Sequence, residues 1–179
     1  MKEKILRTGL VFLPLTVAVI LLDYFSKTWI INNVPAYEPE GYIEVIRNFF
    51  SIVHVHNHGA AFSFLADREG WQKVLFGAVA VLVSCYLLFL MYRNKASDLL
   101  PNISFALIIG GALGNLYDRV QYSYVIDFLD FYMEWGGRIH HWPAFNIADC
   151  GVCVGVFLFV VYEMFFNKKD EEKQDNAGK

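Results

Sequence analysis

The chain has 179 residues, of which 56% are hydrophobic and only 18% are charged, and 15 basic against 18 acidic side chains leave a formal net charge of −3. Soluble domains are about one quarter charged, so this composition indicates a membrane protein rather than a soluble globule. The acidic balance argues against a nucleic-acid-binding protein, and three cysteines are too few for a disulfide scaffold.

Four apolar stretches are each long enough to cross a bilayer as a helix, which takes roughly 20 residues. They are predicted over 10–30, 74–92, 99–117 and 148–166. The first follows Lys2, Lys4 and Arg7, as the apolar part of a cleaved signal peptide would. No small-x-small cleavage site follows it, and Asp23 and Lys27 lie in its outer part, so we expect an uncleaved anchor.

Basic residues concentrate in three short segments, which are the N-terminus, the connection at 93–95 and the C-terminal tail. Because Lys and Arg are enriched in cytoplasmic loops, both termini are predicted to face the cytoplasm. The two long connections, 32–70 and 118–142, then lie outside, and all four tryptophans fall at or beyond the outer interface. We expect one membrane domain over 1–166 and a charged cytoplasmic tail over 167–179.

The first long connection has the pattern of a small β-sheet. β-branched and aromatic residues cluster between Gly41 and Asn57, and Val53-His54-Val55-His56 alternates apolar and polar side chains. The predicted fold is therefore a membrane all-α protein, a bundle of four transmembrane helices with a small extracytoplasmic β-sheet between helices 1 and 2.

Polar side chains from separate segments are predicted to meet at the outer ends of these helices. They come from three of the spans and both long connections: Asp23, Lys27, Asn57, Asn115, Asp118, Arg119, Asp127, Asp130, Asn146 and Asp149. An ionised side chain at the bilayer centre costs at least about 2.5 kcal/mol, so residues of this kind are candidates for function. Gly110 with Gly114, and Gly151 with Gly155, would let the third and fourth spans approach closely.

Five sequence blocks carry a resemblance to a known family. They are Leu22-Asp23-Tyr24-Phe25-Ser26-Lys27, Asn57-His58-Gly59-Ala60-Ala61-Phe62, Gly114-Asn115-Leu116-Tyr117-Asp118-Arg119, Val125-Ile126-Asp127-Phe128 and Phe145-Asn146-Ile147-Ala148-Asp149. In order and topological position they resemble the lipoprotein signal peptidases (signal peptidase II), the membrane aspartyl proteases that mature bacterial prolipoproteins. The resemblance covers roughly Leu6 to Tyr162, and the segment Glu134–His141 looks longer than the corresponding loop of the family.

The resemblance implies cleavage of a diacylglyceryl-modified prolipoprotein immediately before its lipidated cysteine. It assigns the catalytic pair to Asp127 and Asp149, of which one draws a proton from water while the other, protonated, polarises the scissile carbonyl. The residues alone leave Asp118 and Asp130 open as candidates. We also expect the bacterial cytoplasmic (inner) membrane with the site at its periplasmic face, a monomer among membrane lipids, no cofactor, no nucleic acid, and inhibition by globomycin.

Eight further residues are expected to bind substrate or support the site: Asp23, Lys27, Asn57, Gly59, Asn115, Asp118, Arg119 and Asn146. Several have plainer interpretations. Asp23 and Lys27, four residues apart on one helix face, can simply pair, Asn57 can cap a turn, and Arg119 can extend to lipid headgroups. The resemblance favours substrate contact for Asn57 and Arg119.

Three more of these eight residues are expected to support the site. Asp118 is expected to orient Arg119 or the following loop. Asn115 and Asn146 are expected either to satisfy free backbone groups or to steady the two aspartates. Aromatic residues of the outer connections are candidates for clamps or lids over the site: Phe62, Phe64, Tyr122, Tyr124, Trp135 and Trp142.

Three other functions have some support in the sequence. His54, His56 and His58 could project from one strand face as metal ligands, but no His-Glu-x-x-His motif is present and we expect no metal. Cys150-x-x-Cys153 is the motif of thiol oxidoreductases, yet it lies inside the fourth span, and the remaining cysteine offers no second redox pair. A carrier is disfavoured because we find no inverted repeat.

Overall fold

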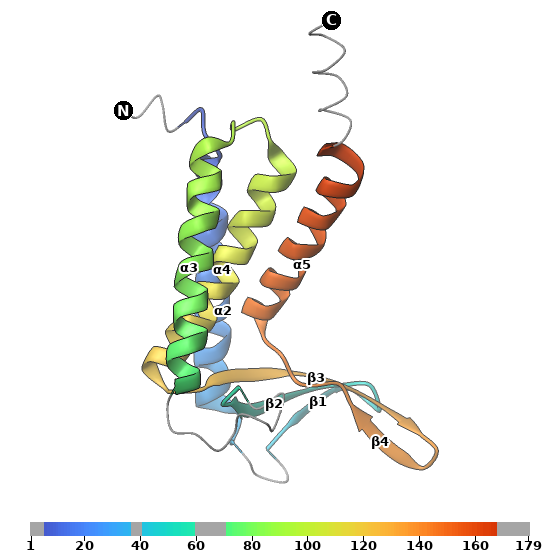
Figure 1. The fold of residues 1–179 in the computed structure, drawn as a ribbon. Helices are drawn as coiled ribbons and strands as arrows, with labels where there is room; N and C mark the ends of the chain where they lie inside the picture. Colours follow the sequence, from blue (N-terminus) through green and yellow to red (C-terminus); the bar gives the residue numbers. More distant parts are fainter. Residues whose placement is uncertain (1–5, 37–40, 60–70, 168–179) are drawn as a thin grey trace, which may run out of the picture.

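The computed structural model describes residues 6–36, 41–59 and 71–167. Four long helices form a bundle, and a β-sheet lies across the end of the bundle where α2 ends and α5 begins (Figure 1). The helices are α2 (Leu13–Asn33), α3 (Trp71–Arg93), α4 (Leu99–Gln121) and α5 (Ile147–Tyr162). A 3-10 turn, η1 (Gly9–Phe12), precedes α2, and a π-helical turn, η3 (Glu163–Asn167), follows α5.

The described residues contain four helical segments that are long and apolar enough to cross a membrane. They are Gly9–Asn33, Lys73–Arg93, Leu99–Gln121 and Ile147–Phe166. These segments confirm the predicted spans, whose ends differ from them by no more than four residues. Large apolar side chains such as Leu22, Leu82 and Phe157 are exposed on the outside of the bundle, as expected for helices that contact lipid.

Two clusters of buried apolar residues hold the bundle and the sheet together. Leu87 and Met91 of α3 pack against Phe105, Ala106 and Ile109 of α4. At the sheet end, Ile30 and Val34 pack against Ile126 and Phe128. The second cluster anchors the sheet directly to the end of α2, so the sheet is positioned by the membrane helices.

Small residues bring α4 into close contact with its neighbours. A Cβ atom on Gly111 would collide with the backbone carbonyl of Ala148, and one on Gly155 would lie 2.8 Å from the Ser104 carbonyl oxygen. The predicted close approach of the third and fourth spans is therefore confirmed. Gly110 differs from the prediction because it faces α2, where its Cβ would lie 2.7 Å from the Cβ of Val19.

The sheet has four antiparallel strands in the order β1-β2-β3-β4. They are β1 (Ile43–Ile46), β2 (Phe50–Asn57), β3 (Val125–Trp135) and β4 (Arg138–His141). The predicted strands between helices 1 and 2 are present, but the sheet is larger than predicted because the second outer connection adds β3 and β4. A two-residue turn, Gly136-Gly137 with φ of +62° and +71°, joins these last strands.

The pairing of β2 with β3 has a β-bulge between Ile52 and Val55. The rings of His54 and His56 contact each other, with centroids 4.9 Å apart, so these two histidines share a face as the alternation predicts. His54 is nevertheless buried, and its Nδ1 lies 2.8 Å from the carbonyl oxygen of Val34 at the end of α2. The local sequence pattern could not reveal this contact, because it joins residues 20 positions apart.

Candidate active site

Asp127 and Asp149 meet where β3 passes the start of α5. Asn146 connects them: its side-chain Nδ2 donates to Asp127 Oδ1 at 2.7 Å, and its backbone N–H donates to Asp149 Oδ2 at 3.2 Å. Asp127 lies in β3, where it is paired with Val55 of β2, and its exposed fraction is 2%. The two carboxylates that the sequence placed in separate segments are therefore held by one residue.

The helix α5 begins at this point because Asn146 and Asp149 form a capping box. The Asn146 Oδ1 accepts a hydrogen bond of 2.9 Å from the Asp149 backbone N–H, and the Asp149 carboxylate accepts from the Asn146 N–H in return. Such reciprocal bonds satisfy backbone donors that a helix start leaves free. The same contacts that start the helix thus fix the carboxylate of Asp149.

Two more amide side chains donate hydrogen bonds to the carboxylates. Asn115 of α4 donates to Asp149 Oδ1 at 2.7 Å, and Asn57 of β2 donates to Asp127 Oδ2 at 2.8 Å. The Asn57 Oδ1 also accepts from the backbone N–H of Gly59, whose φ of +88° favours glycine. Asn57 therefore caps its turn, which was the structural role considered for it in the sequence, and it also donates a hydrogen bond to Asp127.

The environment of Asp127 favours its protonated form. The pKa of Asp127 is raised to about 6, chiefly by burial and also by the negative charge of Asp149, while the hydrogen bond from Asn57 acts in the opposite direction. The hydrogen bond from Asn146 and the charge of Lys27 lower it. A carboxyl group in this range can hold a proton near neutral pH while a neighbouring carboxylate remains available as a base.

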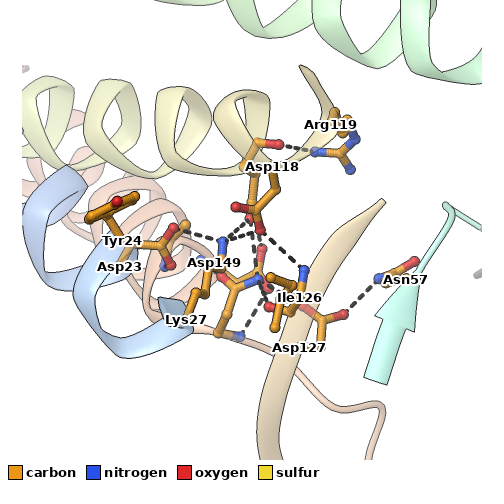
Figure 2. A network of polar contacts seen from close by, with 12 residues as sticks. Asp23, Tyr24, Lys27, Asn57, Asp118, Arg119, Ile126, Asp127 and Asp149 are labelled. Atoms are coloured by element: carbon orange, nitrogen blue, oxygen red, sulfur yellow. Dashed lines mark hydrogen bonds and ion pairs between the residues drawn. The ribbon is translucent and has the colours of Figure 1, made fainter. Parts of the chain in front are cut away.

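A buried ion-pair network lies next to this pair (Figure 2). Lys27 Nζ lies 2.7 Å from Asp23 Oδ2, 2.8 Å from Asp118 Oδ2 and 3.1 Å from Asn115 Oδ1. The predicted pairing of Asp23 with Lys27 is present. Because Asn115 holds Asp149, this network reaches the carboxylate pair through one hydrogen bond.

The two acidic members of the network tie distant segments together. Asp23 Oδ1 accepts from the backbone N–H of Ala148 at 2.9 Å and so connects α2 to the start of α5. Asp118 Oδ2 accepts from the Ile126 N–H at 3.1 Å, which fixes the strand residue next to Asp127. This hydrogen bond corresponds to one of the two roles predicted for Asp118, the orientation of the loop that follows α4.

Arg119 lies near the end of α4 and packs against α3. Its guanidinium lies 5.2 Å from the ring centroid of Phe76 in α3, and its Nη1 donates to the Asn115 carbonyl oxygen at 3.1 Å. Beside Asp127 a cavity of about 310 Å³ is lined by residues that include Val55, His58 and Pro143. Phe76 was missed in the sequence because an aromatic residue in an apolar span carries no distinguishing signal.

The remaining candidates lie elsewhere. Asp130 accepts a hydrogen bond from Ser51 and lies 3.0 Å from His141 Nδ1, at a separate cavity of about 510 Å³ on the sheet. This location separates Asp130 from the pair at Asn146. Asp118 is engaged by Lys27, so neither of the alternatives left open by the sequence is positioned like Asp127 and Asp149.

The competing chemistry finds little support within the described residues. His54 and His56 approach to 3.2 Å through their Nε2 atoms, but no group of three or more His, Cys, Asp or Glu in this part of the chain could hold a metal ion. Cys150 and Cys153 are free thiols in α5. Among the predicted clamps, the ring of Tyr124 stacks on His56 at 3.9 Å, while Phe62 and Phe64 lie outside the described residues.

Comparison with known proteins gives one consistent result. Residues 15–166 match the sequence model of the family described as Signal peptidase (SPase) II. Relatives named lipoprotein signal peptidase, from Yersinia pestis (strain Pestoides F) and Yersinia pseudotuberculosis serotype O:3 (strain YPIII), are each 44% identical over 177 residues, which is 98% of this chain and 99% of theirs.

Two solved structures, each described as a bacterial membrane enzyme, superpose with TM-scores of 0.72 and 0.73 at 26% sequence identity. They cover 86% and 88% of this chain, and 87% and 94% of their own chains. The matches extend over the spans, the sheet and all five sequence blocks. This multi-pass membrane chain therefore belongs to the signal peptidase II family.

Proposed function

We propose that this chain is an aspartic endopeptidase that removes the signal peptide of a lipid-modified prolipoprotein, cleaving immediately before the lipidated cysteine. Family membership supports the peptidase activity and the lipoprotein substrate. The observation that carries the aspartic mechanism is the position of Asn146, which donates hydrogen bonds to the carboxylates of both Asp127 and Asp149.

In this mechanism the pair shares one proton. Because burial raises the pKa of Asp127 to about 6, we assign the resting proton to Asp127, which polarises the scissile carbonyl. Asp149 takes the proton of the attacking water. The tetrahedral intermediate then collapses, the bond between carbonyl carbon and nitrogen breaks, and the leaving amine receives a proton from the pair.

The other predicted site residues have three roles in this proposal. Asn115 and Asn146 orient the two carboxylates, and Asp23, Lys27 and Asp118 hold the helices and β3 that carry them. Arg119, Asn57 and Gly59 face the substrate, with the Arg119 guanidinium binding a backbone carbonyl or a diacylglyceryl oxygen.

The substrate reaches the site laterally from the lipid. We place the protein in the bacterial cytoplasmic membrane, with both termini inside and the site at the periplasmic face, following the distribution of basic residues. One chain supplies both aspartates, so a monomer suffices, and acid–base chemistry of this kind needs no cofactor. Globomycin is expected to inhibit.

The test is cleavage of a purified, lipidated prolipoprotein, followed by gel shift with and without globomycin. Asp127→Asn and Asp149→Asn should each lower turnover by about 10³-fold or more, because each keeps the size of the side chain but removes an ionisable group. Asp130→Asn is the matched control, since Asp130 is a buried aspartate of the same strand at a separate cavity. Normal processing by either variant of the pair would remove that residue from the mechanism.

A further inference from the structure

The segment that looks long for the family, Glu134–His141, forms the outer part of a β-hairpin. Cα partners across the hairpin are Tyr132 with His141, Met133 with His140, Glu134 with Ile139, and Trp135 with Arg138. The hairpin extends sideways from the rest of the sheet, across rather than along the direction of the helices (Figure 1). The mechanism proposed above makes no use of it.

The two faces of this hairpin differ in chemistry. Because directly paired residues lie on the same face and successive residues alternate, Met133, Trp135, Arg138 and His140 share one face. Trp142 extends that face, since its backbone N–H donates to the Phe131 carbonyl oxygen at 2.7 Å. We call these five residues the tryptophan face. The acidic residue Glu134 lies on the opposite face.

The large apolar side chains of the tryptophan face are strongly exposed. The exposed fractions are 76% for Trp135, 69% for Trp142 and 56% for Met133. Two tryptophans and a methionine on one strand pair form an apolar patch, and such patches mark sites of contact with proteins or membranes. The only charge on this face, that of Arg138, is positive.

The position of the hairpin decides between these partners. Trp142 lies five residues before Ile147, where the fourth membrane-spanning segment begins, and five residues span at most about 18 Å. The strand β3 itself is hydrogen bonded to the start of α5 through Asp127 and Asn146. The tryptophan face is thus within five residues of the point where a membrane-spanning helix begins, and a helix that crosses a bilayer ends near the phospholipid headgroups.

We propose that the β3–β4 hairpin is a lipid-binding arm, whose tryptophan face sits among the headgroups of anionic phospholipids beside α5. Tryptophan rings favour the bilayer interface because they combine an apolar body with an N–H donor. A guanidinium binds phosphate through two parallel hydrogen bonds, which suits Arg138 to a headgroup. A zwitterionic surface would satisfy the rings but would attract the positive charge less.

The proposed contact has a consequence for the site. The hairpin continues β3, so a hairpin held in the headgroup layer holds Asp127 at a constant depth relative to the lipid. A substrate anchored by its own acyl chains would then present its scissile bond at that depth. This consequence rests on the proposed function, whereas the lipid contact does not.

The decisive measurement is fluorescence quenching in vesicles of phosphatidylcholine and phosphatidylglycerol. A protein with Trp29→Phe, Trp71→Phe and Trp142→Phe retains Trp135 alone. Its emission should be quenched severalfold more by lipids brominated near the headgroup end of the acyl chain than by iodide in the water. The matched control adds Trp135→Phe and Ile139→Trp, which moves the single tryptophan to the opposite face near the same turn. That control should show the reverse order.

Equal quenching of the two proteins by iodide, with no response to brominated lipid, overturns the proposal. The charge is tested by Arg138→Gln in the protein that retains Trp135. The ratio of quenching by brominated phosphatidylglycerol to that by brominated phosphatidylcholine should fall severalfold, toward one. An unchanged ratio overturns the preference for anionic lipid.

The competing occupant is the substrate polypeptide, which could contact the opposite face, where Tyr132, Ile139 and His141 line the larger cavity. Trp135→Ser should lower cleavage of a vesicle-embedded prolipoprotein severalfold and spare cleavage of the same substrate in detergent micelles. Ile139→Ser should spare both. Loss of cleavage with Ile139→Ser in both settings, with Trp135→Ser unaffected, would show that the hairpin serves the substrate and overturn the lipid arm. The quenching result stands even if neither protein cleaves the substrate, so the two proposals can fail separately.

Discussion

Every carboxylate oxygen of Asp127 and Asp149 accepts a hydrogen bond from an N–H group of an asparagine. These donors carry no charge, so they orient the carboxylates without the strong stabilisation of the ionised form that a directly bonded cation would give. The charge of Lys27 is instead engaged by Asp23 and Asp118. The pKa of Asp127 therefore stays raised, at about 6, in a site that is rich in hydrogen bonds.

The hydrogen bond from Asn57 allows a test of this balance. It favours the ionised form of Asp127, so Asn57→Ala should raise the pKa of Asp127 further, and the limb of the pH–rate profile that reports this group should move to higher pH. A shift of about half a unit to one unit is expected for the loss of one hydrogen bond. The profile of kcat/KM measures it, because a merely lower rate would leave the limb in place. An unmoved limb contradicts the assignment of the proton to Asp127.

Arg119 offers a second test at a single position. If its guanidinium binds substrate, Arg119→Ala should lower kcat/KM by about 10- to 100-fold, the value of one or two charge-assisted hydrogen bonds. The melting temperature should change little. Arg93→Ala is a matched control, because Arg93 also lies over an aromatic ring, that of Phe89 at 5.7 Å, but at the other end of α3. Equal losses of activity in the two variants would assign Arg119 a purely structural role.

At the level of elements, the helices were predictable and the sheet only in part. An apolar run of about 20 residues has few alternatives to a transmembrane helix. The pairing of β2 with β3 joins residues about 70 to 80 positions apart in sequence, and no local pattern specifies such a pairing. Two local signals were available: Gly136-Gly137 as a hairpin turn, and the spacing of Asn146 and Asp149 as a capping box.

The contact between α4 and α5 can be tested through its glycines. Gly111→Ala would drive a methyl group into the Ala148 carbonyl, and overpacking of this kind costs about 1–3 kcal/mol. Gly77→Ala in α3 is the matched control, since its Cβ would meet only a Leu116 methyl at 3.4 Å, an ordinary contact. We expect a lower melting temperature for Gly111→Ala in detergent and an unchanged or higher one for Gly77→Ala. Similar melting temperatures would mean that α4 and α5 can separate without cost.

For the molecule as a whole, the site exists only when all segments are assembled. Asp23 of α2 binds the backbone of α5, Lys27 reaches α4, and Asp118 of α4 fixes the start of β3. The sequence predicted that these side chains meet at one level, because charged residues are costly deeper in lipid. It could not predict which of them would contact the two aspartates, because that depends on side-chain directions set by packing.

The orientation of the whole molecule in the membrane can be tested by labelling with a thiol reagent. At the end of the bundle opposite the sheet, the Ala96 backbone N–H donates to the Arg7 carbonyl oxygen at 3.0 Å, so Arg7 lies beside the α3–α4 connection that carries Lys95. The positive-inside tendency then places Lys95 in the cytoplasm and the hairpin outside. In a protein with Cys85, Cys150 and Cys153 replaced by serine, Glu134→Cys should react with an impermeant maleimide in intact spheroplasts.

Lys95→Cys should react in the same background only after the membrane is permeabilised. The reverse pattern would put the carboxylate pair on the cytoplasmic side, where a prolipoprotein exported through the membrane would not present its cleavage site. The protein with all three cysteines replaced by serine also tests whether the thiols take part in the reaction. The three thiols are free in the structure, so it should retain most of its activity, whereas complete loss would return the Cys150-x-x-Cys153 motif to the mechanism.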